Sequence, residues 1–252
     1  MRRAEGKVAI ITGGAMGMGE AHALAIAKEG GKVVIGDIAV EQGRKLAGAI
    51  GRHALFCELD VTSAASWSAV ISKTEATFGP ITTLVNNAGI VDVGPIDTMA
   101  PSAFQKAMDV NVMGSLLGIQ AVVPSMRSAG GGAIVNISSC AGLVPLPAMA
   151  SYVASKFALT GLSKVASLDL ACDKIRVNSI HPGAIETPMT AGSEPPTRQA
   201  IPRKGRTDEV AAMVLFLISD EASYCTGAEY VVDGGWLNVV GEVAADFQLN
   251  KC

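Results

Sequence analysis

Three side chains suited to proton transfer stand close together in the middle of the sequence. Tyr152 and Lys156 are four residues apart, and Ser139 lies thirteen residues before the tyrosine. A spacing of four places the phenol and the ammonium on one face of a helix, about one turn apart. Free tyrosine ionises near pH ~10, and a neighbouring positive charge favours the phenolate. The spacing therefore predicts that Lys156 lowers the pKa of Tyr152 enough for proton exchange near neutral pH.

A glycine-rich stretch near the amino terminus has the pattern of a phosphate-binding turn. The sequence Thr-Gly-Gly-Ala-Met-Gly-Met-Gly, residues 12–19, follows an apolar run and opens a segment of helical period. Glycines in this setting let a pyrophosphate approach the backbone N–H groups at a helix amino terminus. A tight strand-to-helix turn without a ligand is the alternative explanation.

Two positions bear on which dinucleotide would bind at that turn. Asp37 stands twenty residues after Gly17, where a carboxylate accepts hydrogen bonds from the adenosine ribose hydroxyls and repels a 2′-phosphate. Met16 occupies a place where arginine or lysine could pair with that phosphate. Both positions favour NAD over NADP, although Asp37 could instead cap the helix expected from residue 40.

Short runs rich in valine and isoleucine alternate along the chain with longer segments of helical period. The expected strands are residues 7–12, 32–36, 54–60, 83–86, 133–138, 176–180 and 229–232. The expected helices are residues 17–29, 40–50, 64–78, 101–129, 151–171 and 208–219. Continuously apolar strands are typical of a parallel sheet buried on both faces. We therefore predict a single α/β domain with a doubly wound, seven-stranded parallel sheet and helices on both faces.

Composition and charge narrow the class of protein. The 252 residues are 49% hydrophobic, and 20 Lys+Arg against 23 Asp+Glu give a net charge of -3 without any block of like charge. This balance argues against a nucleic-acid partner. The longest apolar run, residues 211–218, is far shorter than the ~18 residues of a membrane span, and the run at 8–11 is too short for a signal peptide. We expect a cytoplasmic protein that does not enter a membrane.

The cysteines and histidines show neither metal-ligand spacing nor a disulfide pattern, so we expect no metal site and reduced thiols. Cys140 adjoins Ser139, but a small packed thiol is the expected role there, and we assign it no catalytic function. The complete set comprises Cys57, Cys140, Cys172, Cys225 and Cys252, with His22, His53 and His181.

Signatures in sequence order resemble the short-chain dehydrogenase/reductase family over almost the whole chain. They are Thr12-Gly13-x-x-x-Gly17-x-Gly19, Asp60-Val61, Asn86-Asn87-Ala88-Gly89, Asn111, Ser139, Tyr152-x-x-x-Lys156, and Pro182-Gly183 followed by Thr187. The resemblance implies one Rossmann-fold domain over residues 1–252. In it, residues 1–110 are mainly the cofactor half, 111–235 are the catalytic and substrate half, and 237–252 are a tail.

The resemblance also implies a role for each catalytic residue. Ser139 would steady the substrate oxygen, Tyr152 would act as general acid or base, Lys156 would hold the nicotinamide ribose, and Asn111 would position a water. Ser139 is preferred to Ser138 by its distance to Tyr152. The implied cofactor-binding residues are Gly13, Met16, Gly17, Met18, Gly19, Asp37, Ile38, Asp60, Val61, Asn87, Ala88, Gly89, Tyr152, Lys156, Pro182, Gly183, Ile185 and Thr187. An Asn-rich strand end can also simply tie neighbouring strands, and we expect residues 86–89 to do both.

Within the family, residues 130–142 and 224–236 are similar to bacterial NAD-dependent 3α(or 20β)-hydroxysteroid dehydrogenases. This implies interconversion of a secondary alcohol and a ketone on a bulky apolar or steroid-like molecule. The apolar pocket candidates are Val91, Val93, Leu143, Val144, Leu146, Met149, Met189 and Trp236, several of which could instead be core. The alternatives are a 3-oxoacyl thioester (acyl carrier protein) reductase that uses NADPH and a non-catalytic dinucleotide-sensing protein.

The resemblance further implies a homotetramer. The helices at 101–129 and 151–171 would form one interface, and the last strand would form another. We expect the tail at 237–252 to pack on a neighbouring subunit near its active site. The long irregular stretch at 188–206 is either a mobile lid facing the substrate or a solvated connector.

Overall fold

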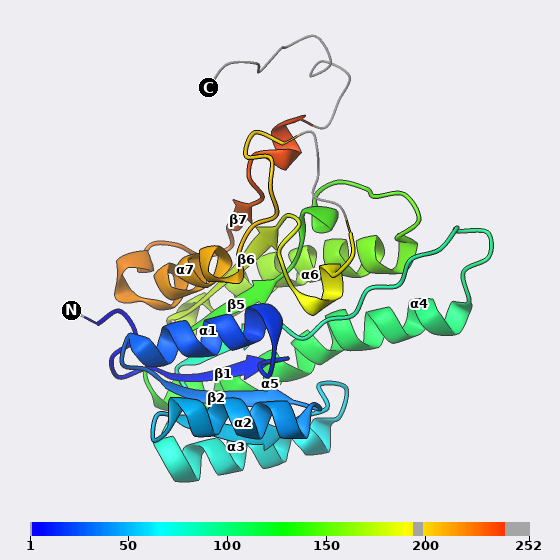
Figure 1. The fold of residues 1–252 in the computed structure, drawn as a ribbon. Helices are drawn as coiled ribbons and strands as arrows, with labels where there is room; N and C mark the ends of the chain where they lie inside the picture. The colour runs from blue at the N-terminus through cyan, green and yellow to red at the C-terminus, as the bar shows by residue number, and fades with distance from the viewer. Residues whose placement is uncertain (1, 194–198, 240–252) are drawn as a thin grey trace.

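The structure of the chain is a computed structural model that describes residues 2–193 and 199–239. Within these residues, seven parallel strands form one sheet in the order β3-β2-β1-β4-β5-β6-β7, and helices cover both of its faces (Figure 1). The strands are β1 Val8–Thr12, β2 Lys32–Asp37, β3 Ala54–Glu58, β4 Thr83–Asn86, β5 Gly132–Ile137, β6 Ile175–Pro182 and β7 Glu229–Val232. This architecture confirms the predicted α/β Rossmann fold.

The longer helices follow the predicted pattern closely. They are α1 Gly17–Lys28, α2 Val40–Ile50, α3 Ala64–Phe78, α4 Pro101–Met108, α5 Gly114–Ser128, α6 Ala150–Asp169 and α7 Thr207–Ile218. Five short 3-10 helices in the described residues were not predicted, because three or four residues are too few to show a period. They are η2 Cys140–Gly142, η3 Ala171–Asp173, η4 Pro188–Thr190, η5 Asp220–Ala222 and η6 Trp236–Val239.

The strands are apolar throughout because each buries both of its faces. Successive residues point to opposite sides of a sheet, and here Ile10 and Ile11 belong to two different hydrophobic clusters. Ile11 packs with residues of α1, α2 and α7, including Ile26 and Val214. Ile10 packs with residues of α3, α5 and α6, including Trp67. Two separate apolar layers therefore sandwich the sheet.

Two strand ends differ from the prediction by two residues, and the other strand ends differ by at most one. β3 ends at Glu58 rather than at residue 60, because Asp60 forms a turn in which its Oδ1 accepts from Thr62 N at 2.9 Å and from Thr62 Oγ1 at 2.7 Å. β6 runs to Pro182 rather than stopping at 180, because its last four residues pair with β7.

The helix predicted over residues 101–129 is interrupted by a π-helical turn, η1 Asp109–Met113. By length and composition, the segment Pro101–Ser128 could cross a membrane, a test that the core helices of soluble proteins also pass. In this protein 44% of its most apolar window is buried, and Ile119, Val122 and Met126 lie in the layer beneath the sheet.

Candidate active site

The crevice for a ligand is fixed by strand order. The chain moves outward from β1 to β3 and then returns to place β4 on the other side of β1. In sheets of this kind, ligands bind beyond the carboxyl ends of the strands at such a reversal. The glycine turn after β1 lies there, and Gly13 and Gly17 both have φ of +59°, a region that only glycine adopts without strain.

The glycine turn packs tightly against the end of β4. A Cβ atom on Gly13 would lie 2.9 Å from the Ala88 Cα, and one on Gly19 would lie 2.0 Å from the Gly13 carbonyl oxygen. Thr12 Oγ1 accepts hydrogen bonds from the backbone N–H groups of Asn87 and Ala88, both at 2.9 Å. These contacts hold the turn and the Asn-rich strand end as one rigid unit.

The start of α1 fits an anionic ligand. Its N-cap residue, Met16, makes no side-chain hydrogen bond to the helix, so no side chain from that position satisfies the N–H groups of the first turn. Backbone donors at such a terminus attract phosphate. Asn87 donates through Nδ2 to Thr12 O at 2.9 Å and to Gly13 O at 3.0 Å, while its buried Oδ1 has no partner within the described residues.

Asp37 ends β2 beside this turn and is 9% exposed. Its Oδ2 accepts from Ala15 N and its Oδ1 accepts from Ala39 N, each at 2.9 Å. The N-cap of α2 is Ala39 rather than Asp37, so the carboxylate braces the turn and does not take the predicted alternative role of helix cap. The neighbouring Met16 and Ile38 are 40% and 72% exposed.

The predicted adenine contacts, Asp60 and Val61, follow β3 on the same edge of the sheet. Asp60 is exposed, whereas Val61 is 8% exposed and packs against Gly114, whose added Cβ would lie 2.7 Å from the Val61 Cγ2. The Asn86 side chain is buried between strands, where Nδ2 donates to Asn136 Oδ1 at 2.8 Å. Asn86 therefore ties β4 to β5, as expected for part of this motif.

Asn111 is fully buried inside the π-helical turn, a kind of distortion that often marks functional sites. Its Oδ1 accepts from Ile90 N at 2.8 Å, and its Nδ2 donates to Ile90 O at 3.0 Å and to Ser155 Oγ at 2.9 Å. Ser155 Oγ in turn donates to Tyr152 O at 2.7 Å. The side chain thus joins the loop after β4 to the first turns of α6.

Ser139 lies near Tyr152, close enough that its hydroxyl lowers the pKa of the phenol. The Ser139 hydroxyl oxygen accepts from Ala141 N at 3.1 Å. Ser138 is instead buried, with its hydroxyl 3.1 Å from both Lys156 O and Thr160 Oγ1. Of the two adjacent serines, Ser139 is the one that influences the pKa of the tyrosine.

Lys156 is buried in the protein interior rather than extended to solvent. It is 4% exposed, its Nζ donates to Ile137 O at 2.8 Å, and burial lowers its pKa to about 8. The Nζ lies 5.5 Å from the centre of the Tyr152 ring. A Cβ on Gly89 would stand 3.5 Å from Nζ and 3.3 Å from Asn111 Oδ1, so lysine, asparagine and the Gly89 backbone are neighbours.

The prediction that Lys156 lowers the pKa of Tyr152 was wrong for this state of the protein. Burial is the largest influence and raises the pKa of Tyr152, the nearby Ser139 hydroxyl lowers it, and Cys140 raises it further. The helix spacing was right, but it does not reveal that the ammonium and the phenol are both removed from water. Desolvation disfavours both charged forms.

The segment after β6 closes the other side of the crevice. Gly183 is required for close packing, because a Cβ there would lie 2.9 Å from Asp233 Cα. Ile185 is 4% exposed and pairs with Gly205 as an isolated parallel bridge. A Cβ on Gly17 would lie 3.6 Å from the Thr187 Cβ. The segment that contains Pro182, Ile185 and Thr187 therefore borders the glycine turn.

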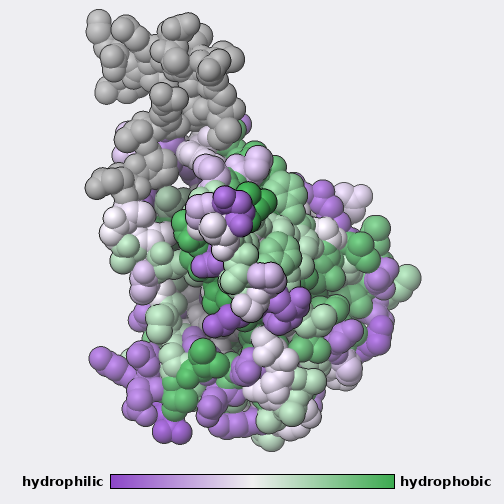
Figure 2. Space-filling view, turned by 90° about the vertical axis from the view of Figure 1, so that its right-hand side faces the viewer, coloured by the Kyte–Doolittle hydropathy of each residue, from purple (hydrophilic) through white to green (hydrophobic). Residues whose placement is uncertain are grey.

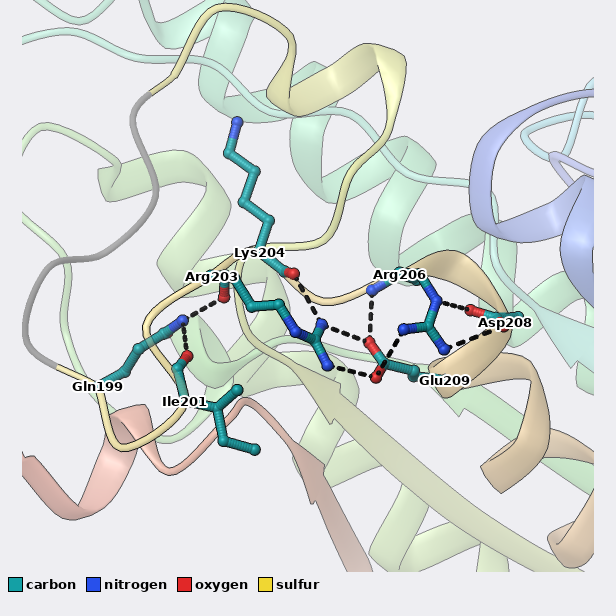
Figure 3. Close-up of polar contacts among 7 residues, drawn as sticks. All are labelled: Gln199, Ile201, Arg203, Lys204, Arg206, Asp208 and Glu209. Carbon is teal, nitrogen blue, oxygen red and sulfur yellow. Dashed lines mark hydrogen bonds and ion pairs between the residues drawn. The ribbon is translucent and has the colours of Figure 1, made fainter. Parts of the chain in front are cut away.

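Ion pairs fasten this segment to α7, an arrangement that the sequence analysis missed. The Glu209 carboxylate accepts from Arg203 Nη1 at 2.9 Å, from Arg203 Nη2 at 2.7 Å and from Arg206 N at 2.6 Å (Figure 3). Gln199 Nε2 donates to the carbonyl oxygens of Ile201 and Arg203. We call Arg203, Arg206 and Glu209 the loop clamp. The sequence Arg206-Thr207-Asp208-Glu209 at a helix start was the available signal.

Hydrogen bonds connect residues 204 and 205, beside the loop clamp, to the segment that borders the crevice. Gly205 N donates to Ala184 O, and Glu186 N donates to Gly205 O, both at 2.9 Å. Lys204 Nζ donates to Thr190 O at 2.9 Å. The stretch at 188–206, predicted as either a lid or a connector, is thus bonded to the rest of the protein near both of its ends. Residues 194–198 lie outside the described part of the chain.

Two of the loops that carry candidate substrate residues are joined to each other. Gly94 N donates to Ala148 O at 2.8 Å, which joins the loop that carries Val91 and Val93 to the loop from Leu143 to Met149. Val93 is 62% exposed and Met189 is 50% exposed. Figure 2 views the side where the strands end and shows apolar surface over the centre of this face, bordered by hydrophilic side chains. Trp236 is the first residue of η6.

A cavity of about 410 Å³ lies beside β6 and β7, and Ile185, Ile201, Arg203, Val232 and Gly234 are among its lining residues. The sequence analysis did not foresee it. It adjoins the loop clamp, whose charged groups already pair with one another.

The cysteines within the described residues are free thiols: Cys57, Cys140, Cys172 and Cys225. Cys140 is 3% exposed, and burial raises its pKa to about 12 with help from nearby Asp233. Such a thiol is unreactive, which agrees with the packed role predicted for it. Across residues 2–193 and 199–239, no cluster of three His, Cys, Asp or Glu side chains could hold a metal ion.

Comparison with known proteins places this site in a family. A family model of the short-chain dehydrogenase type, described as enoyl-(acyl carrier protein) reductase, matches residues 13–237. The chain is 47% identical to 3-alpha-(or 20-beta)-hydroxysteroid dehydrogenase of Mycobacterium tuberculosis over 243 residues, which cover 96% of this chain and 93% of the relative.

Two further relatives are named as dehydrogenases of smaller cyclic alcohols. Trans-4-hydroxycyclohexanecarboxylate dehydrogenase of Sinomonas cyclohexanicum is 43% identical, with 91% of this chain and 92% of the relative covered. Cyclopentanol dehydrogenase of Comamonas testosteroni is 41% identical, with 94% and 99% covered. Dehydrogenases of this kind use a nicotinamide dinucleotide. This chain belongs to the short-chain dehydrogenase/reductase family and is an oxidoreductase of secondary alcohols.

Proposed function

We propose that this protein is an NAD-dependent dehydrogenase that interconverts a cyclic, largely apolar secondary alcohol and its ketone. The observation that carries the proposal is the buried Lys156 ammonium 5.5 Å from the centre of the Tyr152 ring, with the Ser139 hydroxyl near enough to the phenol to lower its pKa. The hydroxyl groups of Ser139 and Tyr152 can both donate hydrogen bonds to a substrate oxygen, and Tyr152 can also transfer a proton. These are the groups needed to reduce a ketone or oxidise a secondary alcohol.

The roles of the residues follow from their surroundings. Burial raises the pKa of Tyr152, so at neutral pH the phenol is protonated and can donate to a ketone oxygen. Ser139 donates a hydrogen bond to the same oxygen as negative charge develops there. In the reverse direction the phenolate accepts the carbinol proton, so alcohol oxidation speeds up as pH rises. The coenzyme, when bound, supplies or accepts the hydride at the carbinol carbon.

The glycine turn and its neighbours suit a dinucleotide. Backbone donors at residues 13–19 would take the pyrophosphate, Asp37 would take the adenosine ribose, and Lys156 would take the nicotinamide ribose. The predicted roles of Asp60, Val61, Gly89, Ile185 and Thr187 remain proposals of the same kind. Asn111 is placed to organise the lysine, because its amide braces the loop beside Nζ.

NAD is favoured over NADP by charge. Asp37 presents a carboxylate beside the turn, and the exposed side chains next to it, Met16 and Ile38, carry no positive charge. A 2′-phosphate would meet repulsion without a compensating cation. Comparing initial rates with NAD⁺ and NADP⁺ tests this, and Asp37→Asn should raise the ratio of NADP⁺ to NAD⁺ efficiency at least about tenfold. Glu75→Gln, at an exposed carboxylate of α3, is the matched control, and an unchanged ratio in Asp37→Asn would refute the assignment.

The substrate class is supported by apolar side chains and by the named relatives. Val91, Val93, Leu143, Met149 and Met189 offer hydrocarbon surface at the open side of the site. The relatives are named for a hydroxysteroid, a hydroxycyclohexanecarboxylate and cyclopentanol, all of which are ring alcohols. Oxidation of a panel from cyclopentanol to a hydroxysteroid, followed at the nicotinamide absorbance band, tests this class. Exclusive activity on linear alcohols would refute it.

The same assay separates the two alternative functions. A 3-oxoacyl thioester reductase would reduce a 3-oxoacyl thioester with NADPH. The matching family model, whose description names the acyl carrier protein, is the observation that favours this alternative. A dinucleotide sensor would bind NADH without turnover of any ketone. Reduction of cyclic ketones with NADH supports the proposal over both.

We further propose that the protein is a cytoplasmic homotetramer that uses the two predicted interfaces. Apolar side chains are exposed along α6, where Phe157, Val165 and Leu168 are 44%, 56% and 77% exposed. Single exposed apolar residues are common, but several on one helix favour an interface. The tail contact on a neighbouring subunit stays a proposal, because residues 240–252 lie outside the described part of the chain.

A further inference from the structure

A buried histidine lies directly behind the serine of the site. His181 is on β6, is fully buried, and has both ring nitrogens within hydrogen-bond distance of a partner. Its Nδ1 lies 2.9 Å from the Ser139 carbonyl oxygen, and its Nε2 lies 2.8 Å from Ser179 Oγ. His181 was unassigned in the sequence analysis, since isolated histidines carry no pattern.

The two partners fix the protonation of the ring. A carbonyl oxygen only accepts, so Nδ1 must carry the hydrogen. Nε2 of the neutral ring then accepts from the Ser179 hydroxyl. Burial lowers the pKa of His181, as do Lys156 and Lys164, whereas the Ser139 bond and Glu229 raise it. The neutral tautomer with hydrogen on Nδ1 is the form that fits these contacts.

Both the hydroxyl oxygen and the carbonyl oxygen of Ser139 accept hydrogen bonds. Its hydroxyl oxygen accepts from Ala141 N at 3.1 Å, and its carbonyl oxygen accepts from Gly142 N at 2.9 Å as well as from His181. The first two donors belong to η2, the short turn that Ser139 itself opens. His181 is the donor from another strand, so it anchors this turn to the sheet.

We propose that His181 is a positioning residue whose ring holds the Ser139 carbonyl and thereby keeps the Ser139 hydroxyl beside the Tyr152 phenol. The inference rests on the proposed function, because His181 acts only through Ser139, whose role belongs to that function. His181 touches none of the reacting groups that the mechanism names. Its effect on the reaction passes through the backbone of residue 139.

A matched pair of amide substitutions tests the inference. The side-chain nitrogen of asparagine can take the place of Nδ1, whereas that of glutamine reaches the place of Nε2. His181→Asn should keep kcat within about threefold of the parent, and His181→Gln should lower kcat about 10- to 100-fold, since small misplacements of a catalytic group cost this much. The Michaelis constant for the coenzyme should not change in either variant.

The pH profile of alcohol oxidation gives a readout that general loosening of the fold would not produce. Ser139 lowers the pKa of Tyr152, and the other influences on the phenol are burial and Cys140, with Lys156 nearby. Displacing Ser139 should therefore raise the pKa of Tyr152 in His181→Gln. In that variant the increase of kcat with pH should occur at a higher pH than in the parent. His181→Asn should leave that increase at the same pH as in the parent. Thermal unfolding of both variants checks that they are equally folded.

A double-mutant cycle with Ser139→Ala separates failure of this inference from failure of the proposed function. If His181 acts through Ser139, His181→Gln should not lower kcat further in the Ser139→Ala background. Full additivity, or a parent-like kcat for His181→Gln alone, overturns the inference. If Ser139→Ala itself turns over at the parent rate, the proposed function fails instead. Should His181→Gln not fold, a shifted pH profile in His181→Asn would also overturn the inference.

Discussion

Two regions hold the backbone around the crevice, and they do so by opposite means. The first region is the catalytic group, Asn111, Ser139, Tyr152 and Lys156, which is held by buried hydrogen bonds to the backbone. Lys156 donates to a main-chain carbonyl, and Asn111 hydrogen-bonds both the N–H and the C=O of Ile90. The loop clamp relies on exposed pairs of opposite charge between Arg203, Arg206 and Glu209 (Figure 3).

The charges respond to these surroundings in opposite directions. Burial lowers the pKa of Lys156 to about 8, toward its neutral form. The Arg203 hydrogen bond is the largest cause that lowers the pKa of Glu209 to about 2, toward its charged form. A buried charge without a countercharge costs stability and serves chemistry, whereas exposed pairs are screened by salt and contribute little. We expect the buried group to decide whether the reaction runs and the loop clamp to adjust how well ligands bind.

The largest expected effect belongs to the phenol at the centre of the buried group. Tyr152→Phe removes the proton donor and should lower kcat about 100- to 10,000-fold, the usual range for general acid catalysis. Steady-state oxidation of a cyclic alcohol measures this, with coenzyme binding by fluorescence as the control for an intact crevice. Alcohol oxidation at the parent rate would show that the proposed chemistry is wrong.

Lys156→Met should abolish most turnover and yet stabilise the folded protein. The pKa of Lys156 falls from 10.5 to about 8 on folding, so below about pH 8 the native state bears a buried ammonium at a cost on the order of 3 kcal/mol. That cost disappears as the pH rises from about 8 to about 10.5, because the native state loses the proton first. The stability gain of the variant should therefore be largest near pH ~7 and fade above pH ~9.

Urea unfolding at two pH values measures the effect of Lys156→Met. Lys45→Met, at an exposed lysine of α2, is the control and should show no such pH dependence. A variant less stable than the parent at neutral pH would mean that the ammonium is better compensated than its contacts indicate.

Asn111→Leu tests whether the buried group is also a structural brace. It leaves the Ile90 N–H and C=O without their partner, which should lower the free energy of unfolding by about 2–3 kcal/mol. Urea unfolding measures the change, and Gln120→Leu, at an exposed position farther along the same helix, is the control. Equal stability of the two variants would contradict the brace.

The smallest expected effect is that of the loop clamp. Glu209→Gln should raise the Michaelis constant for the coenzyme about two- to fivefold at nearly constant kcat, as expected for a surface ion pair. High salt should weaken coenzyme binding in the parent more than in the variant. Because the pKa of Glu209 is about 2, the effect should not vary with pH in the neutral range. Glu41→Gln, at an exposed carboxylate of α2, is the control. A large loss of kcat in Glu209→Gln would contradict the expected division of roles between the two regions.

The local pattern of the chain was enough to predict much of the fold. The strand at 83–86 and the helices at 40–50 and 64–78 have the predicted bounds, because apolar period and turn residues act over a few neighbours. The spacing of Tyr152 and Lys156 likewise placed both on α6. The π-helical turn was missed, since one extra residue in a helical turn leaves no mark on an apolar pattern.

By itself, the sequence determined which residues form strands, where the glycine turn must bend, and which side chains share a helix face. The tertiary structure alone decided the environment of those side chains. Ser139 meets a histidine 42 residues away, Asn111 meets a serine 44 residues away, and Lys156 is taken out of water. Spacing along a helix follows from backbone geometry, but the pKa of a group follows from everything packed around it, and that packing exists only after distant segments have come together.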